Sequence, residues 1–477
     1  MQKKPKRKIR KQIWIPALFL LLILVAYLGF KITENGVFTV IDYKEDPQEV
    51  ATYKHFEFAK RKMKAIDHEQ VCIKNEKGKV VAIKEGLVNF HTKDASENTE
   101  YTMENGENGY LNGNYGSDGL YLDTSQDGKQ VLFQMAGVKG WVDVDSIDLL
   151  LYDPNYTLSS YTKNKDTLVH QVCLNLLENE AISYGIGPVP PFMEDDTTYY
   201  SYDGHYFYTD FKSMSQDVQH NEHANAINQE PYFNFYQYVP HRSKSHAASD
   251  RFNTFLWEQK GIDQLASAYP CLENESVLYD QQPLFMAVQD QVYMNGTMMF
   301  ALACNESGYG QSQYAIEQHN VFGHEAYDSN PDQATLYADL NDCVEQHAQH
   351  FLQEGYANPN DWRYHGSWFG DKGSGINVQY ASDPYWGEKA ASMYYYLDEG
   401  KDASSISIVT KLLDQKLSVE DKKGNVLYSY PEGSVASFIV LEENGNTIKV
   451  QLEAPIQDGK IDVSIPYTEN MVGYVSL

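Results

Sequence analysis

Cysteine and positive charge are both scarce in this sequence. Its 477 residues include five cysteines, which are odd in number, widely spaced and never arranged as Cys-x-x-Cys. This spacing argues against a disulfide framework and against a thiolate zinc site, so we expect buried free thiols. The chain holds 38 Lys and Arg against 66 Asp and Glu, for a formal net charge of −28. A chain with this much negative charge repels nucleic acid. The charge is consistent with solubility outside the cell, or with a cationic or zwitterionic partner.

Long apolar runs are scarce too, with one exception near the N-terminus. Residues 13–30 carry no charge and follow a basic tail over residues 1–12. At about 1.5 Å per residue, such a run spans roughly the hydrocarbon thickness of a bilayer. The positive-inside rule then predicts a single-pass membrane anchor, with a cytoplasmic N-terminus and the bulk of the chain outside the cell. A cleaved signal peptide is the alternative, although no A-x-A-like cleavage site follows the run.

Two regions show the short apolar runs and turn pairs of β structure. Residues 31–150 contain several Asn-Gly and Asp-Gly turns, and the stretch 131–147, with Gly-Trp-Val at 140–142, resembles the closing strands of bacterial SH3-like domains. We expect a small SH3-like β-barrel module there, as a wall-peptide binder or as a spacer. Residues 401–477 alternate again and place Asn444-Gly445 between two runs, which predicts a small C-terminal β domain with a hairpin.

Between these regions the pattern changes twice. Residues 151–280 are rich in Tyr and mix helix with loop, and apolar residues at helical spacing predict a helix over 168–181. Flat aromatic faces suit sugar rings, but Tyr bodies also fill cores. Residues 281–400 hold the motifs that carry chemistry.

The first of these motifs ends an apolar helix with a carboxylic acid. Residues 298–304 are apolar on every side, so a helix here would be buried, and Gly308 and Gly310 stop it just after Glu306. Burial raises a carboxyl pKa because it disfavours the charged form. An acid that is still protonated near neutral pH can donate its proton to a glycosidic oxygen. The alternative is a Glu that ends a helix and points to water.

Three blocks in order and at matching spacing resemble the bacterial N-acetylglucosaminidase family of autolysins. The match covers about residues 285–398. The blocks are A-L-A-C-N-E-S-G-Y-G-Q-S (301–312) with Glu306, Q-H-N-V-F-G-H-E-A (318–326) with Asn320, Phe322 and Gly323, and V-Q-Y-A-S-D-P-Y-W (378–386) with Tyr380, Ala381, Asp383 and Pro384.

The resemblance implies a lysozyme-like, mainly α catalytic domain within a multidomain α+β protein. Glu306 would be the proton donor, and Tyr380 would stabilise the oxocarbenium-like transition state or position water. Asp383 is a second carboxylate or a helix cap. The turn from Asn320 through Phe322 to Gly323 would line the floor of the cleft. The aromatic residues near the motifs would bind sugars or pack in the core; they are Trp368, Phe369, Tyr385 and Trp386.

The implied reaction is hydrolysis of the β-1,4 bond that follows N-acetylglucosamine in peptidoglycan, without a metal or organic cofactor. An inverting, a substrate-assisted and a lytic route all stay open. The expected partners are glycan strands of the wall, the membrane through the N-terminal helix, and a membrane-protein regulator of unknown identity. The chain departs from the family at His324-Glu325, where an aliphatic residue and a Lys are expected, which makes Glu325 another candidate for the second carboxylate.

The sequence also holds features of three other functions. Cys304 and His319 invite a Cys/His peptidase, but a thiol inside an apolar helix is inert. Two His pairs at i, i+3 spacing could bind metal, though neither has an obvious third ligand; they are His220 with His223, and His347 with His350. A wall-binding scaffold with an inactive hydrolase domain is the non-enzymatic alternative, and the presence of Glu306 argues against it.

Overall fold

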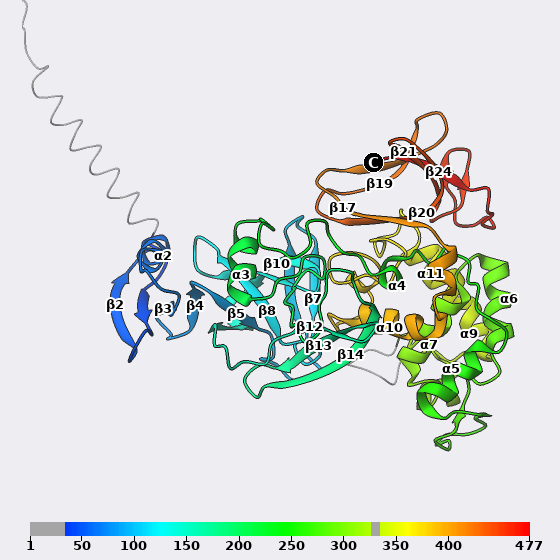
Figure 1. The fold of residues 1–477 in the computed structure, drawn as a ribbon, viewed down its shortest axis with the longest axis horizontal. Helices are drawn as coiled ribbons and strands as arrows, with labels where there is room; N and C mark the ends of the chain where they lie inside the picture. The colour runs from blue at the N-terminus through cyan, green and yellow to red at the C-terminus, as the bar shows by residue number, and fades with distance from the viewer. Residues whose placement is uncertain (1–33, 326–333) are drawn as a thin grey trace, which may run out of the picture.

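The computed structural model describes residues 34–325 and 334–477, and it runs from sheets through a helical domain to a final sheet (Figure 1). The first unit is a four-stranded sheet in the order β2-β1-β3-β4, covered by helix α2 (Phe56–Lys64). Its strands are β1 (Phe38–Asp42), β2 (Gln48–Tyr53), β3 (Val71–Asn75) and β4 (Val80–Ile83).

A seven-stranded antiparallel sheet follows, in the order β11-β5-β8-β9-β10-β6-β7. Apolar side chains such as Val131 and Phe133 alternate into a core that it shares with the first sheet. Its strands are β5 (Gly86–Asn89), β6 (Thr99–Met103), β7 (Asn108–Leu111), β8 (Asp118–Thr124), β9 (Gln130–Met135), β10 (Val138–Asp143) and β11 (Asp148–Leu151).

This arrangement corrects the predicted fold class. The expected strands are present around residues 131–143, where β9 pairs with β10. However, residues 34–151 build two sheets whose seven-stranded member runs in an open order from β11 to β7, so the prediction of one small SH3-like module is wrong. The predicted anchor at residues 13–30 lies outside the described residues. Within 34–325 and 334–477 no helix is both long and apolar enough to cross a membrane.

A third sheet replaces the helix that the sequence predicted over 168–181. Strands β12 (Ser160–Asn164), β13 (Thr167–Asn175) and β14 (Glu180–Pro188) pair in sequence order. In β13 the side chains of Leu168, His170 and Val172 are buried at every second position, which is strand periodicity. The helix prediction was wrong because a buried polar residue, His170, interrupts the apolar alternation.

The helical domain has one core, which runs from Tyr236 to Leu397 and is built around α7. Figure 1 shows its helices gathered at the end of the molecule away from the first sheet. The helices are α3 (Phe211–Gln219), which packs on β8 outside this core, and then α4 (Phe235–Tyr238), α5 (Arg251–Lys260), α6 (Gln282–Val292), α7 (Gly296–Ser307), α8 (Gln313–Glu317), α9 (Leu340–Gln346), the π-helix η3 (His347–Tyr356), the 3-10 helix η4 (Ile376–Val378), α10 (Trp386–Asp398) and α11 (Lys401–Ser405).

The C-terminal unit is a six-stranded sheet in the order β17-β20-β21-β24-β18-β19, and Figure 1 shows it lying over the helical domain. The predicted hairpin is confirmed, because Asn444 pairs with Thr447 across Gly445, whose φ is +64°. The strands are β17 (Ile408–Leu412), β18 (Leu417–Glu420), β19 (Val426–Tyr430), β20 (Val435–Asn444), β21 (Thr447–Gln451) and β24 (Val472–Ser476).

Candidate active site

Helix α7 carries Glu306 in its last turn. Met298 through Cys304 are all buried, as predicted, and the helix ends at Gly308, whose left-handed φ of +57° suits glycine. Ser307 closes the end by donating its hydroxyl to the carbonyl of Ala303, 2.5 Å away. The carboxyl is therefore fixed at the edge of the core rather than on a fraying terminus.

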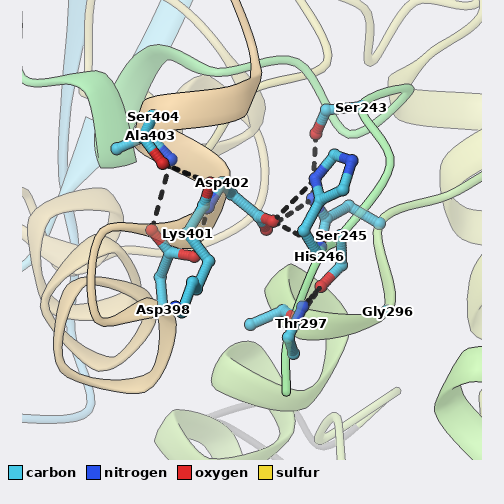
Figure 2. Close-up of polar contacts among 12 residues, drawn as sticks. Ser243, Ser245, His246, Gly296, Thr297, Asp398, Lys401, Asp402, Ala403 and Ser404 are labelled. Carbon is cyan, nitrogen blue, oxygen red and sulfur yellow. Dashed lines mark hydrogen bonds and ion pairs between the residues drawn. The ribbon is translucent and has the colours of Figure 1, made fainter.

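The opposite end of α7 is also held firmly. Asn295 caps the helix by accepting the backbone N–H of Met298 at 2.9 Å. Figure 2 shows Ser245 beside Thr297 in the first turn, and the buried carboxylate of Asp402 turned toward His246. Asp402 accepts the backbone N–H of His246 at 2.5 Å and the hydroxyl of Tyr394 from α10. These bonds tie α7 to the segment before α5 and to α10 and α11, which fixes the direction of the helix.

The partly buried carboxyl of Glu306 meets groups from three segments. Trp386 at the start of α10 donates its indole N–H to Oε1 at 2.5 Å, and the neighbouring Asn305 donates its amide at 3.1 Å. A Cβ built on Gly323 would lie 3.6 Å from Oε2, so this glycine faces the carboxyl directly. Burial raises the pKa of Glu306 to about 7, with a smaller rise from Asp383, while the two hydrogen bonds lower it. A proton is thus available at this carboxyl near neutral pH.

The turn from Asn320 to His324 forms one wall beside Glu306. The buried Asn320 amide closes it by accepting the N–H of His324 at 3.0 Å and donating to the His324 carbonyl at 2.9 Å. Gly323 has a φ of +65°, which glycine adopts without strain. Phe322 is fully buried and stacks on His347 with ring centroids 3.7 Å apart. The asparagine and glycine of the second motif therefore shape this turn.

A stack of neutral histidines lies behind the turn. His324 Nε2 is 3.0 Å from His347 Nδ1, and His324 Nδ1 is 2.7 Å from the hydroxyl of Tyr337. Burial lowers the pKa of His324 to about 3 and that of His347 well below its usual value. The pair therefore packs as uncharged rings, which explains how this chain accommodates a histidine at position 324.

The segment 377–386 forms the other wall. The ring of Tyr380 stacks on Trp386 at 4.6 Å between centroids, and its hydroxyl donates to the carbonyl of Phe322 at 2.8 Å. Tyr380 thus joins the two walls, and Trp386 joins the second wall to Glu306. The three motifs that lie far apart in sequence meet at this carboxyl.

The carboxylate of Asp383 contacts residues that follow it closely in the chain. It accepts the backbone N–H of Tyr385 at 2.9 Å and pairs with Lys389 one turn into α10. The structure thus places it at the approach to α10, where it contacts the start of the helix and the side chain of Lys389.

Other candidates lie elsewhere. Trp368 is fully buried and belongs to the core under the C-terminal sheet, and Tyr385 packs edge-on against His170 in the core of the β-rich region. Both placements correspond to the core-packing alternative rather than to sugar binding. Glu325 is exposed and accepts a hydrogen bond from Thr335 at 2.6 Å. Cys304 is buried in α7, and burial raises the pKa of its thiol, the opposite of what a nucleophile needs.

The cysteines and histidines form no further centre in the described ranges. All five cysteines are free, four buried and Cys271 partly exposed. Within residues 34–325 and 334–477 no cluster of three or more His, Cys, Asp or Glu side chains is arranged to hold a metal ion. His350 pairs with Glu354 on the surface, while His347 packs in the core as described.

Sequence reasoning missed one contact of Glu306, the amide of Asn305. Its position next to the acid gave no signal, because residues adjacent along a helix point in different directions. It also assigned Trp386 to sugar binding, whereas its indole N–H reaches Glu306. Only the fold shows that partnership, since the two residues are 80 positions apart.

Residues 282–399 match the model of the glucosaminidase family, described as mannosyl-glycoprotein endo-beta-N-acetylglucosaminidase. The chain contains a glucosaminidase domain. This domain holds all three motifs, Glu306, and both walls described above. The family assignment from the sequence motifs is confirmed.

Two proteins of Streptococcus pneumoniae, from strains TIGR4 and R6, are each 34% identical to this chain over 132 residues. Both are named for endo-beta-N-acetylglucosaminidase activity. The match covers 27% of this chain and 19% and 18% of the two relatives, so the chain spans less than a fifth of their length. The matched stretch of 132 residues is similar in length to the glucosaminidase match at 282–399.

Solved structures of Staphylococcus aureus autolysin E were also matched, one of them a catalytic mutant in complex with the disaccharide NAG-NAM. Each is 18% identical to this chain and covers 36% of it, and 73% or 74% of its own chain is covered. The TM-scores of 0.26 and 0.24 are too low for this likeness to carry an argument about fold or function.

Proposed function

We propose that the chain hydrolyses the β-1,4 bond that follows N-acetylglucosamine in peptidoglycan, with Glu306 as the general acid. The observation that carries the proposal is a carboxyl at the rim of a buried helix whose pKa is raised to about 7 by burial. Such a group holds a proton at neutral pH and can give it to the leaving oxygen of a glycoside. The glucosaminidase match at 282–399 supports a glycosidase reaction, and the β-1,4 bond in peptidoglycan is part of the proposal.

The proposal gives the neighbouring residues distinct tasks. Trp386 and Asn305 hold the carboxyl in place through Oε1, which leaves Oε2 to face Gly323 and the substrate. Tyr380 positions Trp386 through their ring stack and fixes the distance between the walls through Phe322.

Asp383 acts by positioning the start of α10 in this account, because its carboxylate is already held by Lys389 and by the Tyr385 amide. The attacking group is then water or the substrate's own N-acetyl oxygen. The enzyme would work outside the cell and face the wall. The proposal does not depend on the anchor predicted at residues 13–30.

The test is digestion of purified peptidoglycan by the full chain, with products identified by mass spectrometry before and after borohydride reduction. Wild type should release fragments with reducing-end N-acetylglucosamine, and Glu306→Gln should release at least about 100-fold less, because the amide keeps the shape but supplies no proton. Glu325→Gln is the matched control, since this nearby exposed carboxylate should be dispensable.

Each other outcome has a definite meaning. Reducing-end N-acetylmuramic acid, or its anhydro form, would keep the wall as substrate and overturn the bond. Loss of activity in Glu325→Gln would make that residue the second carboxylate. Binding of both the wild type and Glu306→Gln to the wall without products would support the scaffold alternative and contradict the proposal.

A further inference from the structure

The wall that carries Tyr380 and Trp386 rests on the seven-stranded sheet rather than on the helical core alone. Tyr110 in β7 donates its hydroxyl to the carbonyl of Gln379 at 3.0 Å, and the backbone N–H of Asn112 donates to the carbonyl of Ser382 at 2.8 Å. Both contacts reach the stretch immediately beside Tyr380. The region of the seven-stranded sheet therefore supports this wall through two hydrogen bonds.

A buried lysine completes this support. Lys372 is fully buried, and its ammonium donates to the carbonyls of Asn377 at 2.9 Å, Val378 at 3.3 Å and Ala381 at 2.9 Å. It also lies 4.8 Å from the centroid of the Tyr110 ring, within cation–π distance. Three carbonyls that flank Tyr380 are thus gathered at one point.

The same lysine is fixed to the sheet through its backbone. Its N–H donates to the carbonyl of Ala136, in the turn between β9 and β10, at 2.9 Å. On the other side of that turn, the carboxylate of Asp371 lies against Gly137 so closely that a Cβ there would be 2.4 Å from it. The backbone of Lys372 is therefore held to the sheet, while its ammonium binds the segment 377–381.

A charge in this position needs its three acceptors. Removing an ammonium from water is costly unless every N–H is used, and burial lowers the pKa of Lys372 to about 7, opposed by Asp383 and Asp371. Its three N–H groups match three carbonyl oxygens. An apolar side chain of similar length would leave these carbonyls without donors and free the segment to move.

We propose that Lys372 is a positioning residue for hydrolysis, and that with Tyr110 it makes the seven-stranded sheet part of the catalytic unit. Lys372 acts through Tyr380, whose ring sets the place of Trp386 and hence of the Glu306 carboxyl. The inference deepens the proposed function and depends on it for its kinetic readout only. It also replaces the earlier interpretation of residues 31–150 as a separate spacer or wall-binding module.

The test compares full-chain variants Lys372→Met, Tyr110→Phe and, as the matched control, Lys129→Met, which alters an exposed lysine in the turn between β8 and β9. Two readouts are taken: kcat and KM on soluble glycan strands, and hydrogen exchange of the amides of residues 377–386. We expect Lys372→Met to lower kcat about 10- to 100-fold with KM within about twofold, because a displaced catalytic group costs rate more than binding. Exchange in 377–386 should rise while α7 stays protected.

Tyr110→Phe keeps the ring under the ammonium and removes the hydroxyl that donates to Gln379, so we expect about a threefold loss of kcat and a smaller rise in exchange. Lys129→Met should match wild type in both readouts. If Lys372→Met does not fold, Tyr110→Phe decides the question. Wild-type kcat and wild-type exchange in the folded variant would overturn the proposal, as would a rise in KM with kcat unchanged.

The exchange readout separates this inference from the proposed function. If the wild type releases no glycan fragments, the proposed function fails, and faster exchange at 377–386 in Lys372→Met still establishes that Lys372 holds this segment in place. If the wild type is active and exchange is unchanged in the folded Lys372→Met variant, the positioning role of Lys372 fails and the proposed function stands.

Discussion

The two walls beside Glu306 are held in different ways. The wall from Asn320 to His324 is held by its own asparagine and by α9 and η3 of the same helical core. The wall from 377 to 386 is held by a sheet whose contact residue, Tyr110, lies 269 positions earlier in the chain. The acid itself is thus set by local sequence, while its alignment depends on a distant region. A separately expressed glucosaminidase domain would lose the second wall's support.

Among the variants that test this difference between the walls, Trp386→Phe should lose the most activity. The variant keeps the stack on Tyr380 but removes the indole N–H that reaches Glu306, so the second wall no longer contacts the acid. The bond holds the carboxyl in place, and a misplaced catalytic group can cost about 10- to 100-fold in rate, so we expect that loss in kcat/KM near pH 5, where Glu306 is mostly protonated in wild type and variant. Steady-state kinetics on soluble glycan strands measures it, and unchanged kinetics would mean that the walls do not meet at Glu306.

A smaller effect is expected from Tyr380→Phe. The ring stack stays and only the hydroxyl bond between the walls, to the carbonyl of Phe322, is removed. A neutral hydrogen bond contributes about 0.5–1.5 kcal/mol, which corresponds to a loss of about 2- to 12-fold in kcat. A loss above about 1,000-fold would instead give the hydroxyl a direct part in the chemistry.

The smallest effect should follow Asp383→Asn. The amide oxygen can still accept the Tyr385 N–H, and only the ion pair with Lys389 is lost. Partly exposed ion pairs contribute little, so kcat should fall by no more than about threefold. A fall comparable with that of Glu306→Gln would identify Asp383 as the second catalytic carboxylate and would contradict the positioning role.

The sequence predicted those features of the fold that depend on residues close together in the chain. The buried run 298–304, Glu306 and Gly308 specify the helix end without help from elsewhere, and Asn444-Gly445 specifies its hairpin. Both signals act within a few residues, where helix periodicity and turn chemistry apply.

What the sequence did not predict depends on distant partners. His170 is buried in β13 because its ring pairs with Glu388 of α10 at 2.6 Å, and this polar residue hid the strand pattern. Trp368 is buried because the C-terminal sheet covers it, and Lys372 is buried because loop carbonyls accept hydrogen bonds from its ammonium. Lysine is rarely buried and His and Trp are intermediate in burial, so only the tertiary structure gives the place of these three residues.

The most direct test of the account is the pH dependence of kcat/KM for wild type, Trp386→Phe and Asp383→Asn. A general acid is active while protonated, so the wild-type rate should fall as pH rises through about 7, the raised pKa of Glu306. The Trp386 bond lowers that pKa and Asp383 raises it, so the fall should move to higher pH in Trp386→Phe and to lower pH in Asp383→Asn. Lys372 also titrates near 7, which makes the upward shift in Trp386→Phe the decisive observation. A wild-type rate that stays flat from pH 6 to about 9, or a fall that neither variant moves, would contradict Glu306 as the acid.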